Sequence, residues 1–217
     1  MELEMIPKPL TKQWLKRENR ETKDNHYLRF VQVHDLKIYS TISIAFWIQT
    51  TLKIDPSKNG LQGIPFQESS TDYSVCKNYD QLPQNSPLDW EKVFDTKKWH
   101  IVLTYIEEKP VAGAIIIHNS PEIQMLGLRK DLAVLWDIRV NEEYRGMGIG
   151  RALFQYAMQW AKNQGAQWLK IETQNNNVDA CKFYNRMGCF LGGVDCFAYG
   201  GTAKPSDEIM LLWYKEL

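Results

Sequence analysis

The sequence predicts an α+β domain in which strands come first and strands and helices then alternate. Three observations lead to this prediction. Apolar and polar residues alternate with a period of two in the first half, and the apolar spacing becomes helical only after a glycine-rich turn near residue 148. The chain has 217 residues, of which 44% are hydrophobic and 24% charged, so it can bury the core of one domain.

The charge balance argues against partners that are attracted by a strong overall field. Lysines and arginines number 26, and aspartates and glutamates also number 26, which gives a formal charge of zero. A neutral chain does not concentrate nucleic acid or an anionic membrane, so we expect neither as a partner. The most apolar stretch, residues 41–52, is far shorter than the roughly 20 residues that cross a bilayer.

The four cysteines predict free thiols and no metal site. Cys76, Cys181, Cys189 and Cys196 form no C-x-x-C pair, and no histidine stands at the spacing of a zinc ligand. The first residues have no apolar core behind a basic start, which a secretory signal would have. We therefore expect a soluble protein of the reducing cytoplasm, without a metal cofactor.

The first part of the chain predicts strands and one long loop. Residues 1–24 are polar and predict a short helix anchored by Trp14 and Leu15. Two strand-like runs follow, and residues 42–52 alternate apolar and polar side chains, so we expect a long hairpin. Residues 55–87 are rich in Gly, Pro, Ser and Asn, which is typical of a functional loop or lid.

The same region carries a local excess of acidic residues. Between residues 66 and 95, six aspartates and glutamates stand against two lysines. Such a run is most often a solvated surface. It also favours a cationic partner.

The second half predicts a hairpin, then alternating strands and helices, then two strands. Residues 99–105 and 111–117 form the hairpin around a polar turn. Apolar residues at helical spacing after residue 150 predict a helix that Gly165 ends, and Gly188 closes a second helix. The other expected elements are strands at 132–140, 168–173, 190–198 and 209–215, and the second helix at 179–187.

A glycine-rich turn after the strand 132–140 predicts an anion-binding site. The run Arg145-Gly-Met-Gly148-Ile-Gly150-Arg151 leads from this strand into a helix. Glycine lets a backbone approach a ligand, and the free N–H groups of a helix start favour an anion. The spacing matches neither a dinucleotide fingerprint nor a P-loop, since the glycines alternate and no lysine follows. A tight turn with a purely structural role is the alternative.

A second motif follows in the next helix. It reads Asn177-Val-Asp-Ala-Cys-Lys-Phe-Tyr184, with Gly188 four residues later. In this order the pattern R-x-x-G-x-G and the second motif resemble those of the GCN5-related N-acetyltransferases, the GNAT superfamily. The resemblance covers residues 97–217.

Within the superfamily, the run from Ile171 to Tyr184 is most similar to streptothricin acetyltransferases. Cys189 departs from the family, which commonly has an aromatic residue directly after the glycine, and the first half matches only loosely. The resemblance divides the chain into an N-terminal extension, 1–24, and a single domain, 25–217, with an acceptor-side hairpin and loop at 25–96 and an acetyl-CoA-binding core at 97–217.

The resemblance implies an α+β GNAT fold, in which helices flank a mixed, twisted sheet that is splayed around the acetyl donor, acetyl-CoA. Main-chain groups of Ile138 and Val140 would pair with the pantetheine arm, as an added strand does. Asn177 would bind the pantetheine region, and Tyr184 would place its hydroxyl beside the CoA sulfur. The pyrophosphate would be held by the backbone amides of Arg145, Gly146, Met147, Gly148, Ile149, Gly150 and Arg151.

Acetyl transfer needs a neutral amine, a polarised thioester carbonyl and a proton for the departing thiolate. The resemblance makes Tyr184 the acid, with a core tyrosine as the alternative. We expect an unpaired N–H near Val140 to polarise the carbonyl. Asp137 and Glu172 lie on the strands that flank the cleft and would accept the amine proton through water or attract a cationic substrate. The alternative for both is a structural hydrogen bond or a salt bridge, for example with Arg139.

The residues and the resemblance together predict an acetyl-CoA-dependent N-acetyltransferase. Its substrate would be a primary amine of a small cationic molecule, such as a streptothricin-type antibiotic. One alternative is a protein or peptide N-acetyltransferase whose loop 55–87 grips an extended chain, and another is a sensor that binds acetyl-CoA without turnover. Sheet edges in this fold can pair across subunits, which allows a homodimer.

Overall fold

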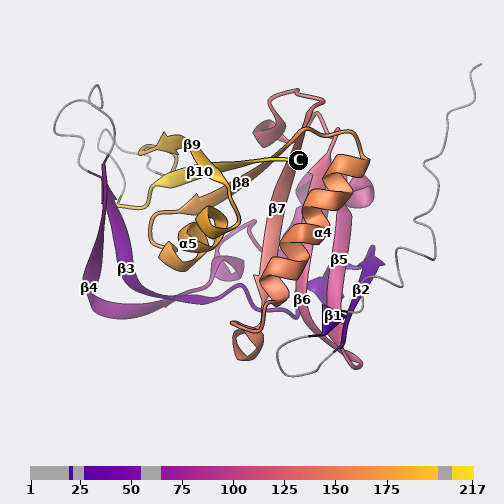
Figure 1. Ribbon diagram of the computed structural model, residues 1–217, viewed down its shortest axis with the longest axis horizontal. Helices are drawn as coiled ribbons and strands as arrows, with labels where there is room; N and C mark the ends of the chain where they lie inside the picture. Colours follow the sequence, from indigo (N-terminus) through magenta and orange to yellow (C-terminus); the bar gives the residue numbers. More distant parts are fainter. Residues whose placement is uncertain (1–19, 22–26, 55–64, 200–206) are drawn as a thin grey trace, which may run out of the picture.

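The structure, a computed structural model, describes residues 20–21, 27–54, 65–199 and 207–217. Within these residues one eight-stranded sheet is formed (Figure 1). In sheet order its strands are β1 (Arg20–Glu21), β2 (Tyr27–Val33), β5 (His100–Ile106), β6 (Lys109–His118), β7 (Leu132–Val140), β8 (Trp168–Gln174), β10 (Met210–Glu216) and β9 (Phe190–Asp195). Only the pair β7–β8 is parallel among the described strands, so the sheet is mixed, as predicted.

The sheet opens between β7 and β8. These strands pair from Leu132 with Trp168 to Leu135 with Ile171, and beyond this point their registers end. Figure 1 shows β8 and β10 turning away from the end of β7. We call this gap the opening.

A β-bulge in β7 lies where the opening begins. Ile115 of β6 faces Asp137, whereas the next residue, Ile116, faces Leu135. Trp136 is thus an extra residue without a partner on β6. An extra residue bends its strand and strengthens the local twist, which accounts for the divergence of β7 from β8.

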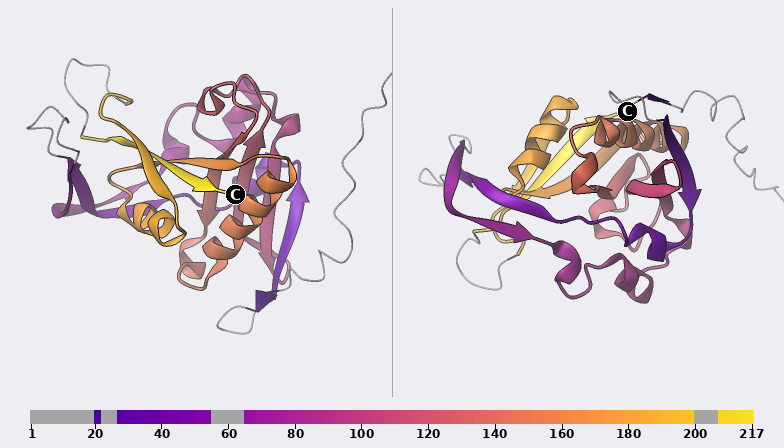
Figure 2. Two further views of the ribbon diagram at one scale, coloured as in Figure 1. Left: turned by 45° about the horizontal axis from the view of Figure 1, so that its top comes forward. Right: turned by 90° about the horizontal axis from the view of Figure 1, so that it is seen from below.

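Two longer helices cover one face of the sheet. The helix α4 (Ile149–Asn163) lies across β6 and β7, and α5 (Val178–Arg186) lies beside β8 on the same side (Figures 1 and 2). Ala133 and Leu135 of β7 are buried in the core that these helices share.

The opposite face carries a second core. The short helices α2 (Leu36–Tyr39) and α3 (Pro87–Val93) lie on this side. They cover an aromatic cluster in which the rings of Trp90, Trp99 and Trp136 are in mutual contact. Short 3₁₀ helices complete the described part: η1 (Tyr79–Gln81), η2 (Thr96–Lys98), η3 (Gln124–Leu126) and η4 (Glu142–Tyr144).

The strands β3 (Phe46–Ile54) and β4 (Phe66–Lys77) form a separate two-stranded ribbon. The predicted hairpin is therefore wrong, because β2 pairs with β5 and β3 pairs with β4. Asp35 caps α2 between them, and Tyr39 and Ile42 are completely buried. Tyr39 therefore anchors a short helix, and Ile42 anchors the segment that follows it, so neither lies in a strand.

The predicted long loop 55–87 is also wrong where the structure describes it. It contains β4 and η1 and reaches the start of α3, and residues 55–64 lie outside the described residues. Strand β4 is rich in Ser, Thr, Glu and Asp, so it has no apolar alternation that would reveal a strand. Three of the six acidic residues form separate ion pairs: Glu68 with Lys182, Asp80 with Arg139, and Asp89 with Lys92.

The second half of the chain follows the prediction closely. The hairpin β5–β6 is present, β7 has the predicted bounds, and both helices end before glycines with left-handed backbone, Gly165 (φ 90°) and Gly188 (φ 75°). The helix expected in residues 1–24 lies outside the described residues, apart from β1. None of the helices in the described part is long and apolar enough to cross a membrane.

Candidate active site

The turn after β7 leaves a row of backbone N–H groups without acceptors. Before the turn, the last backbone N–H that donates a hydrogen bond is that of Arg145. Its acceptor is the carbonyl of Glu142 (3.1 Å). The first helical bond of α4 is donated by Ala152 to the carbonyl of Gly148 (3.1 Å). Between them, the N–H groups of residues 146–151 find no acceptor among the described residues. We call these residues the cradle, because free donors at a helix start bind anions.

Two glycines of the cradle have backbone conformations that other residues rarely adopt. Gly146 has a φ of 82° and Gly148 a φ of 87°, and a Cβ at either position would meet nothing within 4 Å. The space beside them is therefore open to a ligand. A Cβ on Gly150 would lie 3.8 Å from Val140 and 3.9 Å from Phe183, so the start of α4, the end of β7 and α5 meet here.

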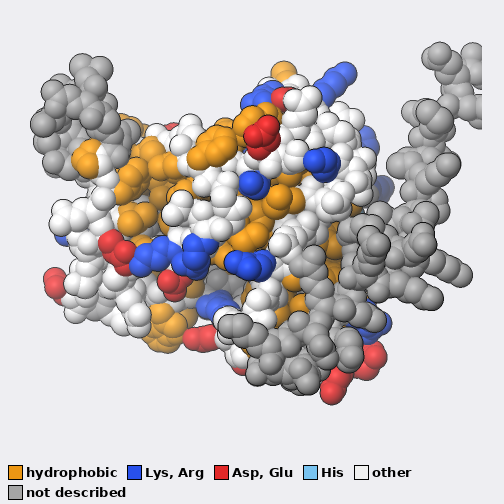
Figure 3. All heavy atoms as spheres, in the orientation of Figure 1, with side chains coloured by type: hydrophobic (Ala, Val, Ile, Leu, Met, Phe, Trp, Pro, Cys, Tyr) orange, Lys and Arg blue, Asp and Glu red, His pale blue; other side chains and the backbone are white. Residues whose placement is uncertain are grey.

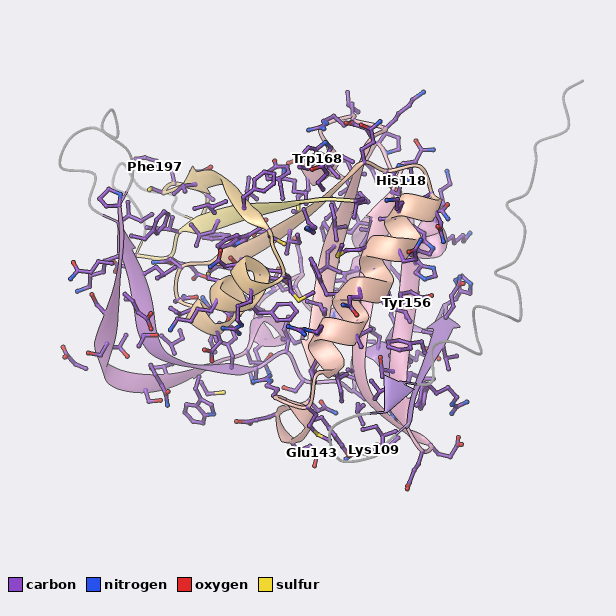
Figure 4. The ribbon with its side chains drawn as sticks, in the orientation of Figure 1. Lys109, His118, Glu143, Tyr156, Trp168 and Phe197 are labelled. Atoms are coloured by element: carbon purple, nitrogen blue, oxygen red, sulfur yellow. The ribbon has the colours of Figure 1, made fainter. Side chains whose placement is uncertain are left out.

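The side chain of Arg145 braces the turn and does not point to the cradle's free donors. Its Nε donates to the carbonyl of Val140 (3.0 Å) and its Nη2 to the carbonyl of Ala45 (2.6 Å). On the other side of η4, the ammonium of Lys109 bonds to Glu143 (2.6 Å), and both residues lie at the same end of the sheet (Figure 4). The turn is thus held from two sides.

The end of β7 presents unpaired main-chain groups to the opening. In an antiparallel ladder, every second residue bonds to the partner strand. The N–H of Asn141 donates to the carbonyl of Val111 (3.0 Å), so the alternation directs the N–H groups of Ile138 and Val140 away from β6. They face the gap that β8 leaves beyond Leu135.

Tyr184 of α5 is a buried tyrosine with an unused hydroxyl. It is 4% exposed and packs against the rings of Phe154 and Phe183. Its hydroxyl forms no hydrogen bond with any described residue. Burial raises the pKa of Tyr184 well above its ordinary value, and Cys189 and Asp137 contribute further. The phenol therefore keeps its proton.

Two asparagines begin α5 beside this tyrosine. The side chain of Asn177 caps the helix by accepting a bond from the N–H of Ala180 (3.3 Å). The side-chain oxygen of Asn176 is buried and has no partner among the described residues. Cys181 lies against the hydroxyl of Thr173, and burial raises the pKa of its thiol, which makes it a poor nucleophile.

Asp137 takes part in a buried ion-pair network. Its carboxylate accepts bonds from the hydroxyl of Tyr39 (2.6 Å) and from Nε and Nη2 of Arg139 (2.9 and 2.6 Å). Arg139 also donates to both carboxylate oxygens of Asp80 (2.9 and 3.2 Å) and to the carbonyl of Ile42 (3.0 Å). All five donors of the guanidinium are thereby used. The salt bridge with Arg139 that the sequence offered as an alternative for Asp137 is present.

Glu172 is the first residue of β8 beyond the last pair with β7. Its Oε1 accepts bonds from the hydroxyl of Tyr199 (2.5 Å) and from the amide of Gln174 (3.4 Å). Its neighbours Ile171 and Thr173 are buried on the side of α5. Because side chains alternate along a strand, Glu172 lies on the opposite face of the sheet.

A second carboxylate, that of Glu208, lies just before β10, the strand that pairs with β8. It accepts a bond from the hydroxyl of Tyr79 (2.6 Å) and pairs with Lys77. Burial raises the pKa of Tyr79 well above its ordinary value, and the hydrogen bond to Glu208 adds to the rise.

Residues 77–80, which we call the strap, connect the two sides of the opening. Lys77 and Tyr79 bond to Glu208 before β10, and Asp80 bonds to Arg139 on β7. Sequence analysis missed Lys77, Tyr79, Tyr199 and Glu208, because no local pattern marks residues that come together from separate segments.

Asn175 attaches the ribbon to the same region. Its side-chain amide donates to the carbonyls of Leu52 and Asp207 (both 3.1 Å) and to the hydroxyl of Thr51 (3.3 Å). Its side-chain oxygen accepts a bond from the N–H of Ile209 (2.8 Å). The structure therefore has two sets of features on opposite faces of the opening: the cradle and Tyr184 on one, and a group of carboxylates and phenols on the other.

Comparisons with known proteins agree with this geometry. The sequence model of the Acetyltransferase (GNAT) family matches residues 66–189. Streptothricin acetyltransferase of Escherichia coli is 36% identical over 109 residues, which are 50% of this chain and 63% of that protein. Streptothricin acetyltransferase A of Bacillus subtilis (strain 168) is 32% identical over 115 residues, which are 52% of this chain and 66% of that protein. The chain thus matches just under two thirds of the length of these curated relatives.

A solved structure has the same fold over most of the chain. It is a Bacillus anthracis protein in complex with acetyl coenzyme A, with a TM-score of 0.66 and 26% identity, and the match covers 88% of this chain and 99% of that chain. The family resemblance and the fold class predicted from the two motifs are confirmed.

Proposed function

Because the chain belongs to the acetyltransferase (GNAT) family, we propose that it transfers the acetyl group of acetyl-CoA to a primary amine of a small cationic substrate. The observation that carries the proposal is the opening between β7 and β8, which has free N–H donors and Tyr184 on one face and Glu172 on the other. Two substrates that enter from opposite faces would meet there without competing for the same groups.

The donor would bind on the face of α4 and α5. The unpaired N–H groups of residues 146–151 fit the pyrophosphate of CoA. Lys and Arg side chains gather over α5 and the start of α4 (Figure 3), which favours the same anion. Main-chain groups of Ile138 and Val140 would pair with the pantetheine arm, and Asn177, with the unpartnered oxygen of Asn176, would contact the same arm.

The residues around the opening would then support direct transfer. The amine nitrogen forms a bond to the thioester carbonyl carbon as the bond from carbon to sulfur breaks. Tyr184 gives its proton to the departing thiolate, the amine loses a proton to water, and solvent returns one proton to the phenolate. The N–H of Val140 would polarise the carbonyl during attack.

The acceptor would bind on the face of Glu172. This carboxylate would attract a cationic substrate, whereas the three bonds that Asp137 accepts suit a positioning role through Arg139 and β7. The similarity to streptothricin acetyltransferases supports a streptothricin-type amine as the acceptor. The homodimer and the cytoplasmic location stay predictions.

The test is release of the CoA thiol from acetyl-CoA with streptothricin and a panel of cationic amines, with calorimetric binding of acetyl-CoA measured alongside. We expect acetyl-CoA to bind and at least one cationic amine to be acetylated. Binding without any turnover would support a sensor instead, and acetylation of peptides alone would support the peptide alternative. Failure to bind acetyl-CoA would contradict the proposal.

A further inference from the structure

Asn175 joins three segments that are far apart in the sequence. It follows β8 directly, and its side-chain amide group bonds to β3 and to both chain neighbours of Glu208. Its backbone adds two bonds, because its carbonyl accepts from the N–H of Leu52 (2.9 Å) and its N–H donates to the carbonyl of Ile209 (3.1 Å). We call Asn175 and its partners the clamp, which comprises Thr51, Leu52, Asn175, Asp207 and Ile209.

The partners of the clamp require the amide of an asparagine. A carbonyl can only accept and a backbone N–H can only donate, so the amide nitrogen faces the carbonyls of Leu52 and Asp207 and the oxygen faces the N–H of Ile209. Asn175 is 3% exposed, so a polar group left unpaired there is costly. An aspartate has the same shape but no donor, and its negative charge would face two carbonyl oxygens.

The clamp fixes the segment that carries Glu208. Asn175 bonds to the residue before Glu208 and to the residue after it, so the backbone of Glu208 cannot shift without breaking a bond of the clamp. Glu208 in turn holds the strap, since its carboxylate pairs with Lys77 and accepts the bond from Tyr79 (2.6 Å). The other end of the strap bonds to β7.

The clamp also fixes the ribbon from which the strap emerges. Strand β4 ends at Lys77, where the strap begins, and Leu52 of β3 pairs with Glu68 of β4. Glu68 forms an ion pair with Lys182 of α5 (2.7 Å), but both side chains are largely exposed, and such pairs stabilise little. The buried bonds of Asn175 therefore hold this part of the ribbon more firmly than the ion pair does.

Both routes lead from Asn175 to the acceptor face of the opening. One runs through Glu208 to the strap, and the other runs through β3 and β4 to the same segment. Resting on the proposed function, we infer that Asn175 is a positioning residue that keeps the strap in place as a wall of the acceptor site. The cradle at the start of α4 does not depend on the clamp, so loss of the clamp should weaken binding of the amine and spare binding of acetyl-CoA.

The experiment compares Asn175→Asp with Asn163→Asp. Asn163 at the end of α4 is the matched control, because its oxygen accepts a bond from Gln159 (2.9 Å) that an aspartate can also accept. With acetyl-CoA at saturation and streptothricin, or the amine of the panel that is acetylated fastest, Asn175→Asp should raise the KM for the amine by about tenfold or more. The value of kcat should fall by a smaller factor, and the dissociation constant of acetyl-CoA should stay the same in both variants.

A role in overall stability alone would have a different result. It would lower the free energy of unfolding of Asn175→Asp and leave the KM for the amine unchanged wherever the variant is folded. That result would overturn the inference. An equal loss of affinity for the amine and for acetyl-CoA would overturn it as well.

Hydrogen exchange tests the clamp without turnover. The N–H groups of Leu52 and Ile209, which donate to Asn175, should be protected from exchange in the unaltered protein. In Asn175→Asp, exchange should become faster in residues 46–54 and 66–81 and stay the same in β5 and β6. Unprotected N–H groups in the unaltered protein would overturn the inference even if the variant does not fold. No acetyl transfer by an unaltered protein whose clamp is protected would instead overturn the proposed function.

Discussion

Arg139 and Asp80 lie 59 positions apart in the chain and form a two-pronged ion pair, with N–O distances of 2.9 and 3.2 Å. The Arg139 side chain is completely buried, whereas that of Asp80 is 20% exposed. The same guanidinium neutralises Asp137, which is 5% exposed at its side chain. Arg139 therefore holds together the strap and the end of β7.

Replacing Arg139 with methionine should destabilise the protein strongly. The change leaves Asp137 buried without a cation, for which the expected loss is about 3–5 kcal/mol in the free energy of unfolding. Asp80→Asn should cost clearly less, because Arg139 keeps Asp137 and Asp80 is partly in water. Urea denaturation of both variants measures the difference. Equal losses in the free energy of unfolding would mean that the burial of each carboxylate does not determine how much its ion pair with Arg139 stabilises the protein.

Tyr184→Phe should lower kcat by about 10²-fold or more, the contribution typical of a general acid. The dissociation constant of acetyl-CoA should stay the same, since the ring still packs against Phe154 and Phe183. Because the pKa of Tyr184 is raised, its titration should not reduce the rate of the unaltered protein up to pH 10. Tyr105→Phe on β5 is the matched control. An unchanged kcat in the Tyr184 variant would place the proton donor elsewhere.

Gly148→Ala should weaken binding of acetyl-CoA by about tenfold. A Cβ at a φ of 87° costs about 1–2 kcal/mol, which the turn would relieve by moving its N–H groups. The control is Gly127→Ala. Gly127 also has left-handed backbone, with a φ of 56° and open space around an added Cβ, but it follows η3 and lies away from the cradle. Calorimetric titration should therefore show weaker binding for the first variant only, and equal effects would refute the assignment of the cradle.

Acidification should destabilise the protein through His100. This residue is 4% exposed, and its ring stacks on Trp160. Burial, with a smaller contribution from His34, lowers the pKa of His100 to about 4. In the unfolded chain His100 binds a proton as the pH falls below about 6.5, whereas in the folded protein it stays neutral until about pH 4. The free energy of unfolding is therefore unaffected by this group above pH 6.5. It falls by up to about 3 kcal/mol as the pH is lowered toward 4. Urea denaturation at several pH values, with His100→Gln as the comparison, measures the slope, and an equal slope in both proteins would exclude His100 as the cause.

The glycine turn and the helix that carries Tyr184 could be predicted because their signals are local. Gly146 and Gly148 need left-handed backbone within one short turn, and the run from Asn177 to Tyr184 lies on one helix. The ends of α4 and α5 were likewise marked by Gly165 and Gly188. Such features depend on neighbours in the sequence, so a sequence pattern contains them.

The contacts of the strap could not be predicted in this way. Tyr79 and Glu208 are 129 positions apart, and only the fold brings them together. The bulge at Trp136 leaves no mark in the apolar run of β7. The sequence predicts a loop where β4 lies, because a strand of an exposed ribbon needs no apolar alternation.

The strap has a thermodynamic consequence. Because residues 77–80 bond to Glu208 on one side of the opening and to Arg139 on the other, an acceptor that displaces Tyr79 also changes the forces on β7, where the donor would bind. The two binding equilibria would then be linked, and linkage is reciprocal: the factor by which the amine changes the affinity for acetyl-CoA would equal the factor by which acetyl-CoA changes the affinity for the amine. Neither substrate of the proposed reaction would be recognised independently of the other.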